Sequence, residues 1–385
     1  MIYLDNAAST QVHEKVVDEM LPYFKERFGN PSSIHKYGRL ASMAVQNARK
    51  RIASLINAEP KEILLTSGGT ESNNTALYGI TYKNKEKHVV TSSIEHDAIL
   101  EPCKRLERGG FQVSYLPVDK YGLVNPEDVK RVISSNPCLI SIMFANNEVG
   151  TIQQIKEICK IAHEKNIPMH TDAVQAVGKI PIDVKDLDVD LLSISSHKIN
   201  GPKGIGALYL KNGIKLDPLI LGGGQENGLR SGTENVPSIV GFGKACQIAK
   251  ESMEQNESHF RRLSTKLRSR VLQEIPYVTF NGHPEKRIPN NTHFTFLGVN
   301  GEDLIIKLDE NDVAASTGSA CSVRIQKASH VLKAMGFSRE QITGSLRLTV
   351  GISNTEKEIE DTVEILKKVV NELRAVSPYK EKYNF

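Results

Sequence analysis

Lys198 is the residue of this chain whose surroundings most directly indicate chemistry. It stands in SSHKINGP (residues 195–202), directly after an apolar stretch. A lysine in a desolvated pocket beside other cations has a lowered pKa, which makes its amine a nucleophile able to form a Schiff base. A surface lysine ahead of a Gly-Pro turn is the plain alternative. Ser195 and His197, which are suited to hold a phosphate, and the upstream Asp172 favour the Schiff-base lysine.

Asp172 is the carboxylate that would complete such a site. It lies in HTDAVQ (residues 170–175), directly after a short apolar strand. A carboxylate there is costly unless it meets a cation, and the protonated pyridine nitrogen of pyridoxal phosphate is a suitable one. Gln175, one helical turn later, could reach the phenolic oxygen of that ring. The alternative, an aspartate that caps a helix, stays open.

A glycine-rich turn, SGGTES (residues 67–72), joins an expected strand to an expected helix. Free backbone N–H groups and the positive end of a helix dipole make such a turn an anion site. A plain glycine turn with Thr70 as a helix cap explains the same residues equally well. The spacing GxxxxGK[ST] is missing, so the turn does not indicate a nucleoside triphosphatase.

Cys321 is the expected reacting cysteine. It lies in ASTGSACS (residues 315–322), a stretch of small residues that favours an accessible thiolate. The other four cysteines fall in apolar strand or helix patterns and read as small buried hydrophobes: Cys103, Cys138, Cys159 and Cys246. An odd number of widely spaced cysteines argues against a disulfide framework or a zinc ribbon and fits a reducing cytoplasm.

The elements that must position these residues alternate between strands and helices. We expect strands at 62–66, 88–91, 112–115, 138–144, 168–171, 191–195 and 206–210, and helices at 37–57, from 70, 98–108 and 155–165. This alternation predicts a mostly parallel sheet sandwiched by helices. Ligands bind such sheets beyond the carboxyl ends of the strands, and five strands here are followed by polar clusters containing Thr70, His96, Asn147, Asp172 and Lys198.

The later part of the chain reads as a smaller α+β domain. A long helical pattern at 236–273, broken near Asn256, precedes expected strands at 292–297 and 345–350 and helices at 302–309 and 356–375. We expect a large cofactor-binding domain over residues 15–255. Residues 1–14 and 256–385 would form the small domain, which carries the cysteine.

Composition excludes several classes of protein. Hydrophobic residues make up 39% and charged residues 24%, and 49 basic side chains nearly balance 45 acidic ones, giving a net charge of +4. Such a surface does not indicate direct nucleic-acid binding. No apolar stretch approaches the roughly 20 residues that span a bilayer, and the first residues lack a signal-peptide pattern. We expect a cytoplasmic enzyme without membrane contact.

Four motifs together resemble the pyridoxal-phosphate cysteine desulfurases of the NifS/IscS type, within the class-V aminotransferase-like family. They are HTDAVQAVGK (170–179), SSHKINGPKGIGALYL (195–210), GGGQENGLRSGTEN (222–235) and STGSAC (316–321). The likeness runs from YLDNAAST near the start to SLRLTVG and the last helix. It implies the fold type I of pyridoxal-phosphate-dependent transferases, with a seven-stranded-type sheet and a smaller α+β domain.

The resemblance also assigns roles around the cofactor. It implies that Lys198 forms the Schiff base, that His96 stacks on the ring and moves protons, and that Asp172 pairs with the ring nitrogen. Gln175 and Asn147 would contact the phenolic side. Four residues would hold the phosphate: Gly69, Thr70, Ser195 and His197.

Other roles concern the substrate and the partners. Arg347 would hold the substrate carboxylate in a bidentate fork, with Asn147 beside it. The resemblance implies a homodimer in which Thr233 reaches the phosphate of the other subunit. Cys321 would take sulfur from L-cysteine as a persulfide, leaving alanine, and pass it to an iron–sulfur scaffold or a tRNA-thiolation protein. No metal site is expected, although Cys321 could ligate a cluster within a scaffold complex.

The chain departs from many relatives after the cysteine. Residues 323–328 read VRIQKA, with two cations and without the usual glycine and proline. This puts the dynamics of the loop and the choice of partner in doubt. A selenocysteine lyase, an aminotransferase on the same fold and a weakly active sulfur-trafficking scaffold remain alternatives. An aminotransferase would have no need of Cys321.

Overall fold

The central element is a seven-stranded sheet with the order β2-β8-β7-β6-β5-β3-β4. The computed structural model describes residues 1–82, 84, 86–133, 137–318 and 328–383. The strands are β2 (Ile63–Thr66), β3 (His88–Ser92), β4 (Gln112–Leu116), β5 (Leu139–Ser141), β6 (Met169–Asp172), β7 (Leu191–Ser195) and β8 (Gly206–Leu210).

The sheet is mostly parallel, as the sequence predicts. β8 runs antiparallel to both of its neighbours, β2 and β7, whereas the other pairs are parallel. Only residues 196–205 connect β7 to β8. A parallel return needs a crossover of about a dozen residues or more, so this short connection reverses the strand. Lys198 lies in that connection.

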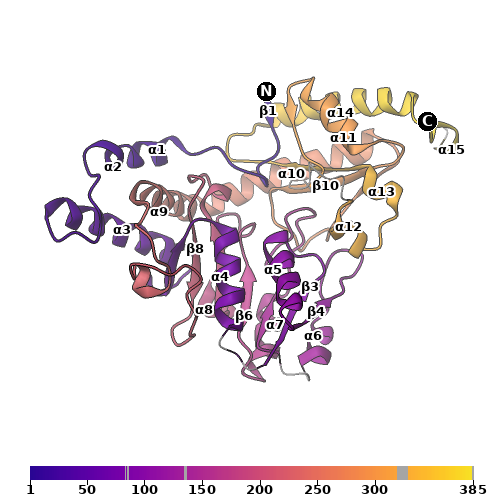
Figure 1. The fold of residues 1–385 in the computed structure, drawn as a ribbon. Helices are drawn as coiled ribbons and strands as arrows, with labels where there is room; N and C mark the ends of the chain where they lie inside the picture. The colour runs from indigo at the N-terminus through magenta and orange to yellow at the C-terminus, as the bar shows by residue number, and fades with distance from the viewer. Residues whose placement is uncertain (83, 85, 134–136, 319–327, 384–385) are drawn as a thin grey trace.

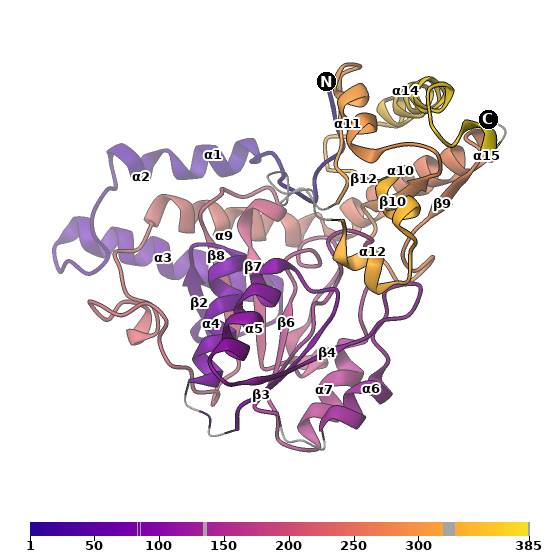
Figure 2. The same cartoon turned by 45° about the vertical axis from the view of Figure 1, so that its right-hand side comes forward.

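Helices cover both faces of the sheet (Figures 1 and 2). Neighbouring strand residues point to opposite faces. Leu64 and Leu191 pack in a cluster with α4 (Gly69–Thr81) and α5 (Asp97–Arg108). Leu65 and Leu192 pack in the opposite cluster, against helices that include α3 (Lys36–Leu55), α7 (Ile155–His163) and α9 (Val236–Glu251). Because both faces are covered, the strands read as continuous apolar runs in the sequence.

The expected strand 138–144 is shorter in the structure. β5 ends at Ser141, although the backbone N–H groups of Ile142 and Phe144 still donate to carbonyls of the next strand. The N–H of Met143, between them, donates to the side chain of Glu95 at 2.9 Å instead of to a strand. The end of the strand is therefore part of the polar edge of the sheet.

A second hydrophobic cluster surrounds the antiparallel sheet β12-β10-β9. Its strands are β9 (Val278–Phe280), β10 (Asn291–Phe296) and β12 (Ser345–Thr349), and its principal helices are α10 (Met253–Glu274), α11 (Gly301–Asp309) and α14 (Glu356–Ala375). β1 (Ile2–Tyr3) pairs with β11 (Val313–Ala314) beside it. The expected break near Asn256 lies at Ser252, between α9 and α10. The division into two domains stays a prediction.

The remaining helices are short. They are α1 (Glu14–Met20), α2 (Pro22–Lys25), α6 (Pro126–Val132), α8 (Val184–Leu187), α12 (His330–Ala334), α13 (Arg339–Thr343) and α15 (Lys380–Tyr383). Within the described residues, no helix combines the length and the apolar character needed to cross a membrane.

Candidate active site

The polar residues predicted for the site follow the carboxyl ends of neighbouring strands. Gly69 begins α4 just after β2, and His96 caps α5 shortly after β3. Asp172 is the last residue of β6, and Lys198 ends the short 3-10 helix that follows β7. Contacts join these ends: a Cβ on Gly69 would lie 3.5 Å from the Cβ of Ser195. The strand order thus brings together residues that lie far apart in the sequence.

The turn before α4 has the shape of an anion cradle. Gly68 is the N-cap of α4 and has a φ of 153°, and a Cβ on Gly69 would meet Val174 at 2.8 Å. The positive φ favours glycine at position 68, and the lack of room for a Cβ favours glycine at position 69. Because Gly68 caps the helix, the interpretation of Thr70 as the cap is wrong. The turn presents the N-terminal N–H groups of a 13-residue helix beside Ser195.

Asp172 is buried and held in place by two hydrogen bonds. Its Oδ2 accepts from Asn73 Nδ2 at 2.7 Å, and its Oδ1 accepts from the backbone N–H of Val174 at 3.0 Å. The residues that follow Asp172 form turns, and the next helix along the described chain, α8, begins only at Val184. The helix-cap alternative is therefore wrong, and Asp172 is a fixed carboxylate at the sheet edge.

Lys198 is half-buried under the N-terminal segment of the chain. Its Nζ donates to the carbonyl oxygens of Ala7 at 2.5 Å and Ala8 at 2.8 Å. The neighbouring His197 lies 3.3 Å from Ser9 Oγ through its Nδ1. Burial and the charge of Lys198 lower the pKa of His197 to about 4, so its imidazole is neutral at physiological pH. The simple surface lysine is not what the structure shows.

His96 is oriented by its own helix. Its Nδ1 accepts from the backbone N–H of Ala98 at 3.0 Å, which leaves Nε2 as the nitrogen that carries the proton in the neutral ring. The residue before it, Glu95, is fully buried and binds Ser92 Oγ at 2.6 Å. Burial raises the pKa of Glu95 to about 8. Sequence reasoning did not single out Glu95, although it directly precedes His96.

Arg347 on β12 comes from the other hydrophobic cluster and faces this edge. Its Nη1 donates to the carbonyl of Asn147 at 2.9 Å, so the two residues predicted to hold the substrate do meet. Its Nη2 donates to Asp5 Oδ1 at 2.8 Å. Asp5 is a carboxylate that sequence reasoning missed. Its Oδ1 is the acceptor at the Nη2 end of the guanidinium.

Glu148 is a buried carboxylate that belongs to the polar cluster expected after the strand at 138–144, although no role was predicted for it. Its Oε2 accepts from Ser329 Oγ at 2.5 Å, and a Cβ on Gly318 would lie 3.3 Å from its Cγ. Burial raises its pKa. Glu148 therefore contacts described residues on both sides of the segment 319–327. Cys321 and almost all of the VRIQKA run lie outside the described residues.

The other four cysteines are buried and free, as expected. Burial raises the pKa of Cys138 to about 11 and those of Cys103 and Cys159 to about 12, and that of Cys246 lies well above its usual value. Buried thiols with raised pKa values are poor nucleophiles.

Thr233 is exposed. Arg230, in the same loop, binds Glu71 of the first turn of α4 at 2.9 Å. This ion pair ties the loop to the phosphate-type turn of its own chain. The role of Thr233 between two subunits stays a prediction.

Known proteins resemble this chain in both sequence and fold. The model of the aminotransferase class-V family matches residues 2–362. This chain belongs to that family. A cysteine desulfurase IscS from Methanosarcina thermophila is 50% identical, over 98% of this chain and 94% of its own. One from Clostridium botulinum (strain Hall) is 48% identical, over 99% and 97%.

Solved structures of NifS-like proteins show the same fold. One has a TM-score of 0.90 at 37% identity, covering 96% of this chain and 99% of its own. A NifS-like protein from Rickettsia africae has a TM-score of 0.87 at 32% identity, with the same coverage. The fold type I prediction and the resemblance to the cysteine desulfurases are confirmed. This class-V enzyme uses pyridoxal phosphate.

The residues of the site fit that cofactor. The glycine cradle offers backbone N–H groups to a phosphate, and Asp172 offers a fixed carboxylate to a pyridinium. Lys198 could supply the amine for covalent attachment at the same edge. The three groups are of the kinds that the chemistry of the cofactor requires.

Proposed function

We propose that this class-V enzyme converts L-cysteine to L-alanine and keeps the sulfur as a persulfide on Cys321. The observation that carries the proposal is the meeting of Lys198, His96 and Asp172 at one edge of the sheet, with Arg347 facing them. Relatives named cysteine desulfurase, about half identical over nearly the whole chain, support it.

In this proposal the cofactor, when bound, withdraws electrons from the bonds around the substrate α-carbon. Lys198 holds the cofactor and Asp172 keeps its ring nitrogen protonated. His96 covers the ring and moves protons through Nε2, because Nδ1 is engaged by its own helix. Gln175 and Asn147 face the phenolic side. Gly69, Thr70, Ser195 and the neutral His197 hold the phosphate.

Arg347 binds and orients the substrate. A guanidinium offers two parallel donors to a carboxylate, a geometry that a lysine cannot reproduce. Asp5 and the carbonyl of Asn147 fix the plane of the guanidinium before the substrate arrives. The α-carbon is thereby directed toward the edge of the sheet, where Lys198 and His96 lie.

The sulfur step belongs to Cys321. Its thiolate attacks the sulfur of the substrate, so that an S–S bond forms while the C–S bond of the substrate breaks. The electron pair stays on the substrate carbon, which takes a proton, and the products are alanine and a persulfide. Since the four described cysteines are buried with raised pKa values, none of them is suited to replace Cys321.

The test is product analysis with wild type and Cys321→Ser. With L-cysteine and no reductant, the wild type should form a persulfide on Cys321, detected by mass spectrometry of peptides. With a small-thiol reductant it should release alanine and sulfide in equal amounts. Cys321→Ser should bind cysteine but form no persulfide. Amino-group transfer without sulfide release would instead indicate an aminotransferase, and a sulfur-trafficking scaffold would show neither product.

We also propose a homodimer with Thr233 acting between subunits. Large apolar side chains are exposed around α1, α2 and the start of α3, including Leu21, Phe24, Phe28, Ile34 and Met43. An exposed group of this size favours an interface. Lys198→Ala and Thr233→Ala should each be impaired alone. A mixed dimer would contain one site with both native residues and should regain activity, whereas no recovery would contradict the shared site.

The sulfur acceptor we propose is an iron–sulfur scaffold or a tRNA-thiolation protein in the cytoplasm. Cys321 could then serve as a cluster ligand within a scaffold complex. Transfer of labelled sulfur from the purified enzyme to each class of acceptor tests this. A transfer rate equal to that of a small thiol for both classes would contradict it.

A further inference from the structure

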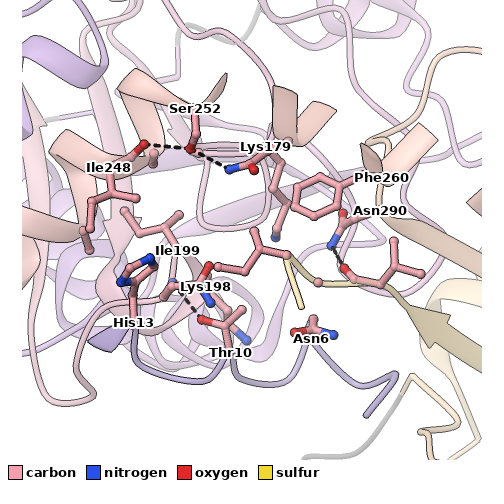
Figure 3. Close-up of a pocket in the computed structure, with 18 residues that line it drawn as sticks. Asn6, Thr10, His13, Lys179, Lys198, Ile199, Ile248, Ser252, Phe260 and Asn290 are labelled. Carbon is pink, nitrogen blue, oxygen red and sulfur yellow. Dashed lines mark hydrogen bonds between the residues drawn. The ribbon is translucent and has the colours of Figure 1, made fainter. Parts of the chain in front are cut away.

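Lys179 is a buried amine that the reaction described above does not use. It is 4% exposed and ends the motif HTDAVQAVGK. Its Nζ donates to the backbone oxygen of Gln175 at 3.0 Å and to the side-chain Oε1 of Gln175 at 2.9 Å. Figure 3 shows Lys179 together with Lys198 among the residues around a cavity of about 180 Å³. A second lysine thus lies beside the one that holds the cofactor.

No acidic group compensates the charge of Lys179 in the described structure. No carboxylate of the described residues lies within ion-pair distance of its Nζ, and both of its hydrogen bonds go to oxygens of Gln175. Burial, followed by the positive charges of Lys198 and Arg347, lowers its pKa to about 7. An amine is expensive to bury in such a place. An apolar side chain would be buried there at a lower free-energy cost, so the buried amine indicates a function.

That function follows from the hydrogen-bond donors of the lysine amine. In its charged form, below its pKa of about 7, the amine of Lys179 has only donors, so the group that faces it must then be an acceptor. Oε1 of Gln175 therefore faces Lys179, and Nε2 must point the other way. There Nε2 donates to the carbonyl of Ala7 at 3.0 Å, and Lys198 Nζ donates to the same oxygen at 2.5 Å. The orientation of the Gln175 amide is therefore set at both ends, by Lys179 at Oε1 and by the carbonyl of Ala7 at Nε2.

We propose that Lys179 is a positioning residue that fixes the amide of Gln175 so that its Nε2 donor faces the phenolic oxygen of the cofactor. The inference rests on the contact between Gln175 and the cofactor given in the proposed function. Without Lys179, only the carbonyl of Ala7 still favours this orientation, and the amide can turn more readily and present its oxygen to a phenolic oxygen that carries negative charge. The donor would become a repulsive acceptor, although every group that touches the cofactor is still present.

The variants follow from this geometry. Lys179→Met keeps the length of the side chain and removes its donors. Lys179→Arg keeps a side chain with donors only, and the adjoining cavity leaves room for it. Gln175→Ala removes the amide on which Lys179 is proposed to act. The double variant Lys179→Met with Gln175→Ala completes a cycle that separates action through Gln175 from a direct effect of charge.

The measurement is the pH midpoint of the visible absorbance band of the cofactor-loaded protein. A donor to the phenolic oxygen stabilises its negative charge, so its loss should raise the midpoint by about one pH unit in both Lys179→Met and Gln175→Ala. The double variant should match Gln175→Ala alone, and Lys179→Arg should match wild type. If Lys179→Met does not load cofactor, Lys179→Gln replaces it and should show an intermediate shift.

Several outcomes would overturn the inference. Shifts that add in the double variant would mean that Lys179 acts directly by its charge. A shift of the midpoint in Gln175→Ala without one in Lys179→Met would mean that the amide keeps its orientation without Lys179. No shift in either variant would mean that Gln175 does not contact the phenolic oxygen. None of these readouts requires desulfuration. Absence of alanine and sulfide would count against the proposed function and leave the absorbance result interpretable.

Discussion

The two halves of the candidate site are built in different ways. At the edge of the large sheet, each polar residue lies within a few positions of a strand end, as Asp172 and Lys198 do. Arg347 lies within β12, and its side chain binds residues 342 and 200 positions away, Asp5 and Asn147. The sheet edge is thus set by local order along the chain, whereas the Arg347 half exists only when distant segments have met.

The difference separates two kinds of task. The sheet edge carries the groups that we propose to hold the cofactor, and its strands are buried on both faces. The Arg347 half joins the N-terminal segment, the residues after β5 and the small sheet. Changes at the edge should therefore alter the chemistry itself, and changes around Arg347 should alter how well a substrate is held.

Lys198→Ala should give the largest effect. It removes the amine proposed to attach the cofactor, so alanine formation should fall below detection, and the visible band of the cofactor should be lost or displaced. Lys203→Ala, which changes another lysine of the same connection between β7 and β8, is the matched control and should retain activity. Full turnover in Lys198→Ala would end the assignment of the chemistry to the sheet edge.

Arg347→Lys should act mainly on substrate binding. One ammonium cannot reproduce two parallel hydrogen bonds to a carboxylate, and charged bonds of this kind contribute about 1.5–3 kcal/mol. We expect kcat/KM for cysteine to fall roughly ten- to hundredfold, chiefly through KM. The cofactor spectrum without substrate should stay that of wild type. A changed spectrum would show that the two halves are not separable in this way.

Asp5→Asn should have a smaller effect of opposite sign. The amide oxygen can still accept from Arg347, but the negative charge beside the incoming carboxylate is gone. Two like charges about 4 Å apart in water repel by about 1 kcal/mol, so KM for cysteine should fall roughly two- to fivefold. Steady-state kinetics at low salt measures this. A rise in KM would mean that Asp5 chiefly orients the guanidinium.

Glu95→Gln should change the pH dependence of stability more than activity. The folded protein raises the pKa of Glu95 from 4.5 to about 8, so the stability contributed by its protonated form is complete below about 4.5. It is lost as the pH rises through about 8. Glutamine does not titrate, so the decrease in Tm between about pH 5 and about pH 9 should be smaller in the variant.

The control for this prediction is Glu254→Gln, the same change at an exposed position of α10. It should leave the pH dependence of Tm as in wild type. An unchanged profile in Glu95→Gln would mean that the carboxyl titrates alike in the folded and unfolded chain. Burial would then not hold Glu95 in its protonated form in the folded protein.

The contrast between the halves also explains what the sequence could predict. Asp172 and Lys198 were found because each follows an apolar run, and the order of strands and helices implied that their ends meet. Asp5 was missed, and Glu148 was placed in a polar cluster without a role, because their importance depends on Arg347 and Ser329, which lie 342 and 181 positions away. No local pattern encodes such a pairing. The reversal of β8 had a visible signal, because its connection to β7 is too short for a crossover.

The N-terminal segment sets an order of events during synthesis. Thr349 Oγ1 donates to the carbonyl of Leu4, which leaves the ribosome 345 residues earlier, and Ala7 and Ala8 cover Lys198 from the same segment. At about 5–20 residues per second, Ala7 and Ala8 wait roughly 10–40 s for Lys198, and Leu4 waits roughly 20–70 s for Thr349. The sheet can collapse in that time, but its catalytic edge stays uncovered. A nascent chain that stalls before β12 would therefore carry the lysine without the backbone oxygens arranged to receive it.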